Sequence, residues 1–250
     1  MHRRHFLKAL AGLALCPLCA PTTRAADAHW SYEGATGPEK WSDLDAASKV
    51  CSIGSQQSPV DIGPSIRAQL PRLKIQWPSR ADTIVNNGHT IQLNFAPGGR
   101  LLLGRESYDL LQLHFHRPSE HLIDGKNFPM EAHFVHRNAA GNLAVVGVLM
   151  SAGKHNAAFA RVVATMPDKE GPGVKADPAF TPRKLLPRQL SYYRYPGSLT
   201  TPPCSETVEW LVLKNPIAVA EADIAAFAKL YPMNARPAQK SNRRAVLRSE

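Results

Sequence analysis

Long hydrophobic runs are almost absent from this 250-residue sequence. The longest lies within Phe6–Cys19 and is about ten to fourteen residues long, whereas a membrane-spanning helix needs roughly 20. We therefore predict no membrane span and a soluble mature protein. Internal repeats, low-complexity tracts and linkers rich in Gly, Ser or Pro are also absent, so the part of the chain after residue 28 is predicted to form one domain, residues 29–250.

Acidic and aromatic residues are both scarce. The chain has 20 Asp and Glu against 30 Lys and Arg, a formal net charge of +10, which raises the question of a nucleic-acid or membrane-surface partner. Only 7% of the residues are aromatic, however, and no basic patch interleaved with aromatics or known nucleic-acid motif is present. We therefore predict no nucleic-acid partner.

The first 28 residues have the pattern of an export signal. A basic start is followed by the apolar run and by small residues suited to cleavage after Ala25 or Ala28. The stretch Arg3-Arg4-His5-Phe6-Leu7-Lys8 resembles a twin-arginine signal, and a Sec signal with a chance Arg pair is the alternative. Cleavage near residues 25–28 predicts a periplasmic protein. A cut after Ala26 removes four basic residues and no acid, which leaves a charge of 10 − 4 = +6.

Cysteine is scarce and none lies between residues 89 and 136, where most histidines fall, so those residues cannot form a Cys2His2 or four-Cys structural zinc site. Cys16 and Cys19 lie in the predicted signal, so the mature chain retains Cys51 and Cys204. In an exported protein two such cysteines indicate one disulfide, here closing a loop of about 150 residues. A buried pair of free thiols is the alternative.

Alternating hydrophobic patterns predict a fold dominated by a sheet with a few peripheral helices. Helical periodicity occurs in residues 156–166 and 221–230, and the proline-rich stretch 167–182 is predicted to be a surface loop. The expected strands are residues 73–77, 83–85, 90–95, 101–103, 108–117, 131–137, 143–150 and 207–213.

Six of the ten histidines fall between His89 and His136. On a strand over residues 108–117, successive side chains alternate between faces, so that one face carries Gln112, His114 and His116 and the other carries Leu111, Leu113 and Phe115. On a strand over residues 131–137 the same alternation puts Glu131, His133 and Val135 on one face and His136 on the other. If the two strands pair, His133 supplies a third imidazole beside the first two.

Three imidazoles without a fourth protein ligand are typical of a catalytic zinc site that keeps one coordination position open. Gln112 and Glu131 each precede a proposed ligand by two residues, where they could accept hydrogen bonds from imidazole N–H groups. The alternative for His114 and His116 is a pair of histidines on a half-exposed sheet face. For His133 and His136, each taken singly, an ordinary structural role is favoured over metal binding.

Several blocks of the sequence resemble the alpha-class carbonic anhydrases of the exported bacterial type. They follow the family's order over about residues 29–240 and comprise His29-Trp-Ser-Tyr32, Gln57-Ser-Pro-Val-Asp61, Asn86-Asn-Gly-His89, Gln112-Leu-His-Phe-His116, Pro118-Ser-Glu-His121, Glu131-Ala-His-Phe-Val-His136, Tyr195-Pro-Gly-Ser-Leu-Thr-Thr-Pro-Pro203 and Arg236-Pro-Ala-Gln239. The resemblance implies an α+β, mainly β fold with a large, mixed, mostly antiparallel twisted sheet and a few short peripheral helices.

The resemblance also implies roles for individual residues. Zinc would be the cofactor, with His114, His116 and His133 as ligands, Gln112 and Glu131 as their hydrogen-bond partners, and His136 no ligand. Thr200 would form a hydrogen bond to the zinc-bound oxygen and Glu120 would hold the Thr200 hydroxyl. His89 would be the proton shuttle, and Cys51 and Cys204 lie where exported bacterial members carry a disulfide. The substrate pocket would include Gln92, Val135, Val145, Leu199, Thr201, Val208 and Trp210.

The implied function is the reversible hydration of carbon dioxide to bicarbonate and a proton by zinc-bound hydroxide. Its partners would be small molecules only, in a monomer or homodimer. One alternative is a general zinc-dependent esterase or hydrolase. Another is a non-catalytic, carbonic anhydrase-like binding protein, and retention of His114, His116, His133, Thr200 and Glu120 argues against it.

Overall fold

The structure, a computed structural model, describes residues 29–77 and 80–250, so the predicted signal and its two cysteines lie outside the described residues. Helices are short: α1 (Val50–Ile53), α2 (Ala157–Thr165), α3 (Glu221–Ala228) and three 3-10 turns, Gly34–Thr36, Pro38–Asp43 and Pro182–Leu185. The strands are β1 (Asp61–Ile62), β2 (Ile66–Arg67), β3 (Lys74–Gln76), β4 (Thr83–Asn86), β5 (Ile91–Asn94), β6 (Arg100–Leu103), β7 (Glu106–His116), β8 (Leu122–Ile123), β9 (Lys126–Asn127), β10 (Met130–Arg137), β11 (Leu143–Ala152), β12 (Val174–Lys175), β13 (Tyr192–Gly197), β14 (Val208–Leu213), β15 (Ile217–Val219) and β16 (Leu247–Arg248).

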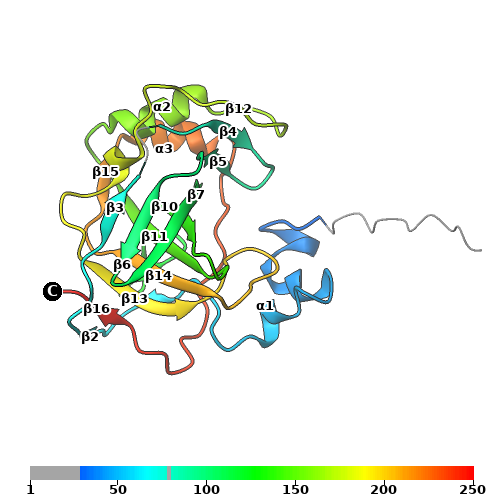
Figure 1. Cartoon of the computed structure of the whole chain (residues 1–250). Helices are drawn as coiled ribbons and strands as arrows, with labels where there is room; N and C mark the ends of the chain where they lie inside the picture. Colours follow the sequence, from blue (N-terminus) through cyan, green and yellow to red (C-terminus); the bar gives the residue numbers. More distant parts are fainter. Residues whose placement is uncertain (1–28, 78–79) are drawn as a thin grey trace, which may run out of the picture.

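One large mixed sheet dominates the described chain (Figure 1). Its path runs β12-β4-β5-β7-β10-β11-β14-β13-β16-β2, with β6 beside β7, β3 beside β6, and β15 beside β11. Most neighbouring strands are antiparallel, and β11 pairs in parallel with β14 and β15. A separate small sheet joins β1, β8 and β9. The predicted fold class, mainly β with a large, mostly antiparallel sheet, is confirmed.

Each predicted strand and helix has a counterpart in the structure, with ends that differ by a few residues. The sequence did not predict β13, in which Pro196 pairs with Glu209 although proline lacks the N–H that a strand normally donates. It also missed β12, two exposed residues inside the predicted surface loop that pair with β4.

A register shift between β7 and β10 changes which side chains of β7 face the core. Val135 pairs with Gln112 and His136 with Leu110, so Leu111 has no partner on β10. Leu110 is therefore buried on one side of the bulge and Leu113 on the other, whereas Leu111 is only half-buried. Leu113 and Phe115 are buried together in the core, as the alternation predicts, and the bulge interrupts that alternation at Leu111.

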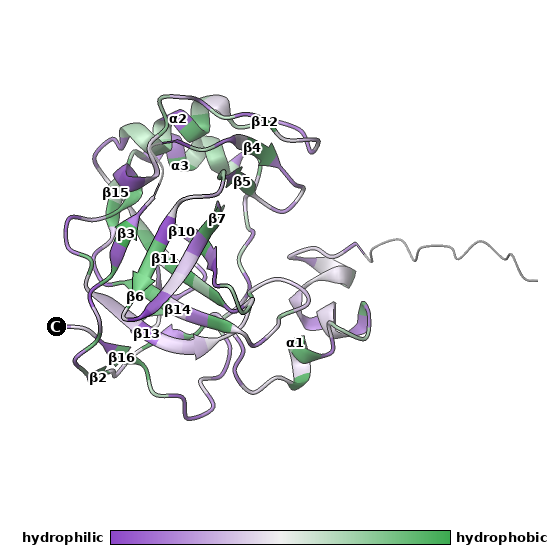
Figure 2. Ribbon diagram, viewed as in Figure 1, coloured by the Kyte–Doolittle hydropathy of each residue, from purple (hydrophilic) through white to green (hydrophobic). Residues whose placement is uncertain are grey.

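The main hydrophobic core lies on the sheet face opposite the clustered histidines. Phe115 of β7 packs against Phe159 of α2 and Phe227 of α3, with ring centroids 5.3 and 6.2 Å apart. Helix α2 begins at its cap Asn156, whose side chain accepts hydrogen bonds from the backbone N–H groups of Ala158 and Phe159. Figure 2 shows hydrophobic residues on both helices, which lie together at one end of the sheet.

A disulfide joins Cys51 of α1 to Cys204, 153 positions along the chain, and confirms the predicted bridge. Both cysteines are buried, and they pack with Trp41 in a small cluster that joins the segment before β1 to the loop after β13. Among the described residues, no helix is both long and apolar enough to cross a membrane.

Candidate metal centre

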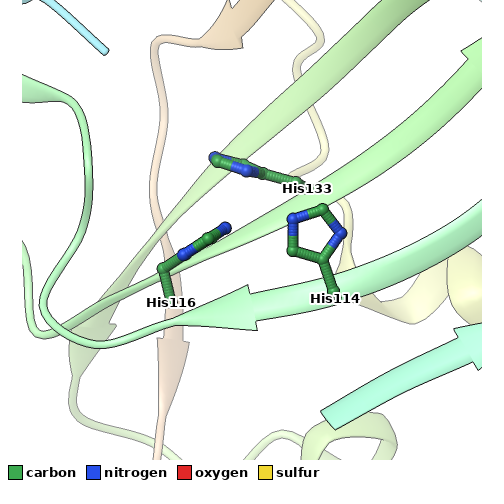
Figure 3. Close-up of side chains that lie close together, drawn as sticks. All are labelled: His114, His116 and His133. Atoms are coloured by element: carbon green, nitrogen blue, oxygen red, sulfur yellow. The ribbon is translucent and has the colours of Figure 1, made fainter. Parts of the chain in front are cut away.

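Three histidines from two neighbouring strands converge on one point (Figure 3). His114 and His116 project from the same face of β7, and His133 projects from β10, where it pairs directly with His114. The ring centroids are 4.9 Å apart for His114 and His116, 5.2 Å for His114 and His133, and 4.5 Å for His116 and His133. One nitrogen from each ring lies within 4.8 Å of the others.

Polar contacts at one nitrogen of each ring decide which nitrogens face the centre. Nδ1 of His114 lies 2.7 Å from Oε1 of Gln112, and Nδ1 of His116 lies 2.7 Å from the carbonyl oxygen of Asn234. Nε2 of His133 lies 3.0 Å from Oε1 of Glu131. The nitrogens left for a metal are therefore Nε2 of His114, Nε2 of His116 and Nδ1 of His133.

This donor set fits a metal ion. Nε2 of His116 is buried and has no hydrogen-bond partner within residues 29–77 and 80–250, which is costly unless the atom has another ligand. Three imidazole nitrogens with no fourth protein ligand are the donors of a catalytic zinc site. The triad of His114, His116 and His133 is thus suitable for zinc.

Burial keeps two of the ligands in the neutral form that binds a metal. Desolvation holds the pKa of His114 well below its usual value, and nearby His116 and His133 lower it further. Desolvation also lowers the pKa of His116, against the opposing charge of Glu120. A neutral imidazole offers a free lone pair, so these histidines are ready to coordinate without first losing a proton.

Glu131 anchors a second set of buried polar groups behind the triad. Burial alone would raise its pKa, but His121 and His133 hold the pKa of this carboxyl well below its usual range. His121 Nδ1 lies 2.8 Å from Glu131 Oε1, and His121 Nε2 lies 2.7 Å from the hydroxyl of Tyr195. Because both nitrogens of His121 are occupied, His121 supports Glu131 and is not itself free to bind a metal.

Sequence reasoning missed the supporting roles of His121 and Asn234. His121 stands at the end of the block Pro118-Ser-Glu-His121, so the motif contained the signal although its contact with Glu131 was not foreseen. Asn234 accepts from His116 through its backbone carbonyl. A backbone contact between residues 118 positions apart leaves no trace in side-chain patterns.

Glu120 and Thr200 are both buried, and Glu120 lies beside the centre. Oε1 of Glu120 accepts a hydrogen bond from the backbone N–H of Arg236, at 2.8 Å, and Oε2 lies 3.6 Å from Nε2 of His116. Oε2 has no hydrogen-bond partner among the described residues. The hydrogen bond expected between Thr200 and Glu120 is therefore absent here, and the roles of both residues stay predictions.

The loop after β13, which carries Thr200 and Thr201, is tied to the rest of the molecule. Ser198 exchanges two hydrogen bonds with Ser58, one through each backbone N–H, at 2.9 and 3.1 Å. The backbone N–H of Cys204 donates to the carbonyl oxygen of Thr201, at 2.9 Å, so the disulfide-bonded residue closes the turn. The position of Thr200 is thus fixed from both sides.

The residues predicted to form the substrate pocket gather beside the triad. Val135 pairs with Val145 on β11, which pairs in turn with Trp210 on β14. Val208 belongs to the same hydrophobic cluster, and Leu199 packs against it. Gln92 on β5 pairs with His114. The geometry brings apolar side chains and the three imidazoles onto one face of the sheet.

His89 lies in the turn between β4 and β5, outside the triad. Its ring stacks on Trp30, with centroids 3.6 Å apart and planes inclined by 5°, and lies 5.9 Å from the ring of His29. Burial and the neighbouring His29 lower the pKa of His89, whereas Glu170 acts in the opposite direction.

Comparison with known proteins places this chain among close relatives. Residues 36–250 match the model of the family described as eukaryotic-type carbonic anhydrase. The chain is 40% identical over 234 residues to a carbonic anhydrase of Pectobacterium carotovorum, covering 92% of this chain and 95% of that protein. It is 42% identical over 238 residues to a carbonic anhydrase of Neisseria gonorrhoeae, covering 94% of each. A solved structure of alpha-carbonic anhydrase from Thermovibrio ammonificans, in complex with the inhibitor sulfanilamide, is similar with a TM-score of 0.86 and 42% identity, over 89% of this chain and 100% of that one.

Proposed function

Because the chain belongs to the eukaryotic-type, or alpha, carbonic anhydrase family and is a carbonic anhydrase, we propose that His114, His116 and His133 hold zinc for the hydration of carbon dioxide. The observation that carries the proposal is the convergence of three imidazoles, two buried and one half-buried, whose outer nitrogens lie against Gln112, Glu131 and the Asn234 carbonyl and whose inner nitrogens are available. Such a centre converts carbon dioxide and water into bicarbonate and a proton, reversibly.

When bound, zinc supplies Lewis acidity that lowers the pKa of water to near neutrality, an effect best known from carbonic anhydrases themselves. The chain contributes by fixing the ligands. Gln112, Glu131 and the Asn234 carbonyl each hold one imidazole in a single tautomer and orientation. The negative charge of Glu131 also partly balances that of the cation.

Thr200 and Glu120 orient the attacking oxygen. During turnover the Thr200 hydroxyl would donate to Oε2 of Glu120, which has no other hydrogen-bond partner among the described residues, and could then only accept a hydrogen bond from the attacking oxygen. That oxygen therefore presents a lone pair toward the substrate. Arg236 supports this arrangement because its backbone N–H fixes the other carboxylate oxygen of Glu120.

Carbon dioxide occupies the apolar side of the centre. Val135, Val145, Leu199, Val208 and Trp210 offer it a dry surface with no strong polar attachment, which suits an uncharged, apolar substrate. Gln92 and Thr201 would form the polar border of this pocket. Bicarbonate, being charged, is bound less well there and leaves.

His89 carries the proton away. An imidazole with a pKa near neutrality accepts a proton from the centre and releases it to buffer. Its place in a turn and its stacking on Trp30 support this proposal.

The protein is exported to the periplasm by residues 1–28 through the twin-arginine or the Sec route. The buried disulfide between Cys51 and Cys204 supports export, because disulfides persist in oxidising compartments and are rare in the cytosol.

Replacement of one ligand tests the proposed centre. His116→Ala removes a buried nitrogen that has no other partner, so zinc content falls from about one per chain to near zero, and carbon dioxide hydration is lost with it. Metal analysis and stopped-flow hydration assays measure both. His155→Ala, at an exposed histidine outside the triad, is the control and keeps both. Full activity in His116→Ala would refute the ligand assignment.

A further inference from the structure

The loop between α2 and β12 is fastened to the turn that carries His89. Asn86 makes both connections: its side-chain Nδ2 donates to the carbonyl oxygen of Pro167, at 3.1 Å, and its own carbonyl oxygen accepts from the backbone N–H of Gly171, at 3.2 Å. Just beyond, Val174 of β12 pairs with Ile84 of β4 (Figure 1). The loop therefore keeps a defined position against the turn between β4 and β5.

This fastening puts the carboxylate of Glu170 against the residue before His89. A Cβ atom at Gly88 would lie 2.9 Å from both the carboxyl carbon and Oε2 of Glu170. Gly88 has a φ of +83°, so the position suits glycine for its backbone as well as for this close approach. Glu170 is exposed, and the mechanism proposed above assigns no role to its side chain.

The groups around His89 act on its pKa in different directions. His29 and the stacked Trp30 lie on one side, and a cavity of about 280 Å³ that His89 lines is also bordered by Tyr231 and Glu33. Burial raises the pKa of Tyr231 to about 12, so Tyr231 is uncharged near neutrality. Burial and His29 disfavour the imidazolium form of His89, and Glu170 favours it.

We propose that Glu170 is a positioning residue for proton transfer: from the fastened loop, its carboxylate stabilises the protonated form of His89 against Trp30. This inference rests on the proposed function of His89. One proton moves from the centre to the imidazole and then to a buffer base, and Glu170 itself exchanges none. Without the carboxylate, the imidazole accepts a proton less readily near neutral pH, and this step slows.

Glu170→Gln tests the proposal because glutamine keeps the size of the side chain and removes its charge. The NMR titration midpoint of His89 falls by about half a pH unit, the size expected of an exposed charge pair. In weak buffer kcat falls about twofold, while kcat/KM is unchanged because His89 takes no part in the attack on carbon dioxide. Asp168→Asn removes another exposed carboxylate of the same loop and leaves the midpoint and kcat as they were.

Two further measurements separate an electrostatic role from a structural one. At about 1 M salt the Debye length is roughly 3 Å, so the difference in midpoint between the native protein and Glu170→Gln disappears. In a His89→Ala background, Glu170→Gln lowers kcat no further. An unchanged midpoint, an equal effect of Asp168→Asn, or a loss of kcat that persists without His89 would each overturn the role of Glu170. Full kcat of His89→Ala in weak buffer would instead overturn the shuttle assignment, with the midpoint still reporting on Glu170.

Discussion

At the scale of single residues, two histidines three positions apart on β10 have opposite environments. His133 faces the metal centre, and His136 faces the core, where Nε2 accepts a hydrogen bond from Nε1 of Trp77, at 2.9 Å. Nδ1 of His136 donates to the carbonyl oxygen of Ala144, at 3.2 Å. Both nitrogens are thus used in the neutral form, and burial lowers the pKa of His136 to about 4.

The low pKa of His136 makes stability depend on pH. The unfolded chain binds a proton at this residue near pH 6.5, whereas the folded chain does so only near pH 4. The unfolded state therefore holds more protons between these values, and the free energy of unfolding falls by about 3 kcal/mol as the pH drops through this window. The glutamine of His136→Gln retains an acceptor and a donor but cannot ionise. This variant therefore does not lose stability through residue 136 as the pH drops.

Urea unfolding at pH 7, 5.5 and 4 measures the effect. Other acid-sensitive groups act equally on both proteins, so the difference between the native protein and His136→Gln isolates the histidine. From pH 7 to pH 4 the free energy of unfolding of the native protein should fall by about 3 kcal/mol more than that of His136→Gln. Parallel curves for the two proteins would contradict a neutral, buried His136.

At the scale of elements, strands β7, β10 and β11 build the centre through their register. His133 of β10 pairs with His114 on one side and with Gly147 of β11 on the other. A Cβ atom at Gly147 would lie 2.8 Å from Oε1 of Glu131, the oxygen that contacts His121 and His133. Glycine at this strand position is explained by the room that the carboxylate needs.

Gly147→Ala is expected to displace Glu131 from its two histidine partners. Loss of such a supporting contact weakens metal binding or activity by about 10- to 100-fold. Zinc competition titrations and hydration assays measure both. Gly63→Ala is the control, because nothing lies within 4 Å of a Cβ placed there, and it should bind zinc normally. Unaltered zinc affinity in Gly147→Ala would show that Glu131 can move without cost.

At the scale of the whole molecule, the disulfide and Arg236 tie the N-terminal segment to the sheet. Arg236 is buried, and its Nη atoms donate to Oε1 of Gln57 and to the carbonyl oxygens of Ser58 and Cys51. Its backbone N–H holds Glu120 at the centre. The segment closed by the Cys51–Cys204 bridge therefore connects directly to the catalytic face.

Export and the disulfide together predict a difference between two preparations. Protein recovered from the periplasm should contain no free thiol at Cys51 or Cys204, whereas residues 29–250 made in a reducing cytoplasm should contain both. Closure of a loop of about 150 residues stabilises by roughly 4 to 5 kcal/mol, so the cytoplasmic form unfolds at lower urea concentration until it is oxidised. Thiol titration and urea unfolding measure this.

A Cys51→Ser/Cys204→Ser variant serves as the control for that comparison. Its free energy of unfolding should be the same from either compartment and close to that of the reduced native chain. If the native protein recovered from the periplasm kept both thiols free, formation of the bridge in that compartment would be refuted. If oxidation left stability unchanged, the stabilising role of the bridge would be refuted.

Much of the fold and the triad could be predicted because period-2 patterns are local. Residues 131–137 alternate, so the sequence placed His133 and His136 on opposite faces, as the structure has them. The same reasoning did not predict the bulge at Leu111, opposite Val135 and His136, which interrupts the alternation. It also passed over β13, whose Pro196 is a poor strand former in isolation and is held there by pairing with β14.

The sequence by itself determined the main strands, the paired histidines and the family, because side-chain periodicity and motif spacing are properties of neighbouring residues. Only the tertiary structure decided which nitrogens remain free, since their partners include a carbonyl at Asn234, 118 positions from His116. It also decided that Glu170 reaches the turn before His89, through hydrogen bonds made by Asn86. Contacts between distant segments depend on how the whole sheet pairs and packs, and no local pattern encodes them.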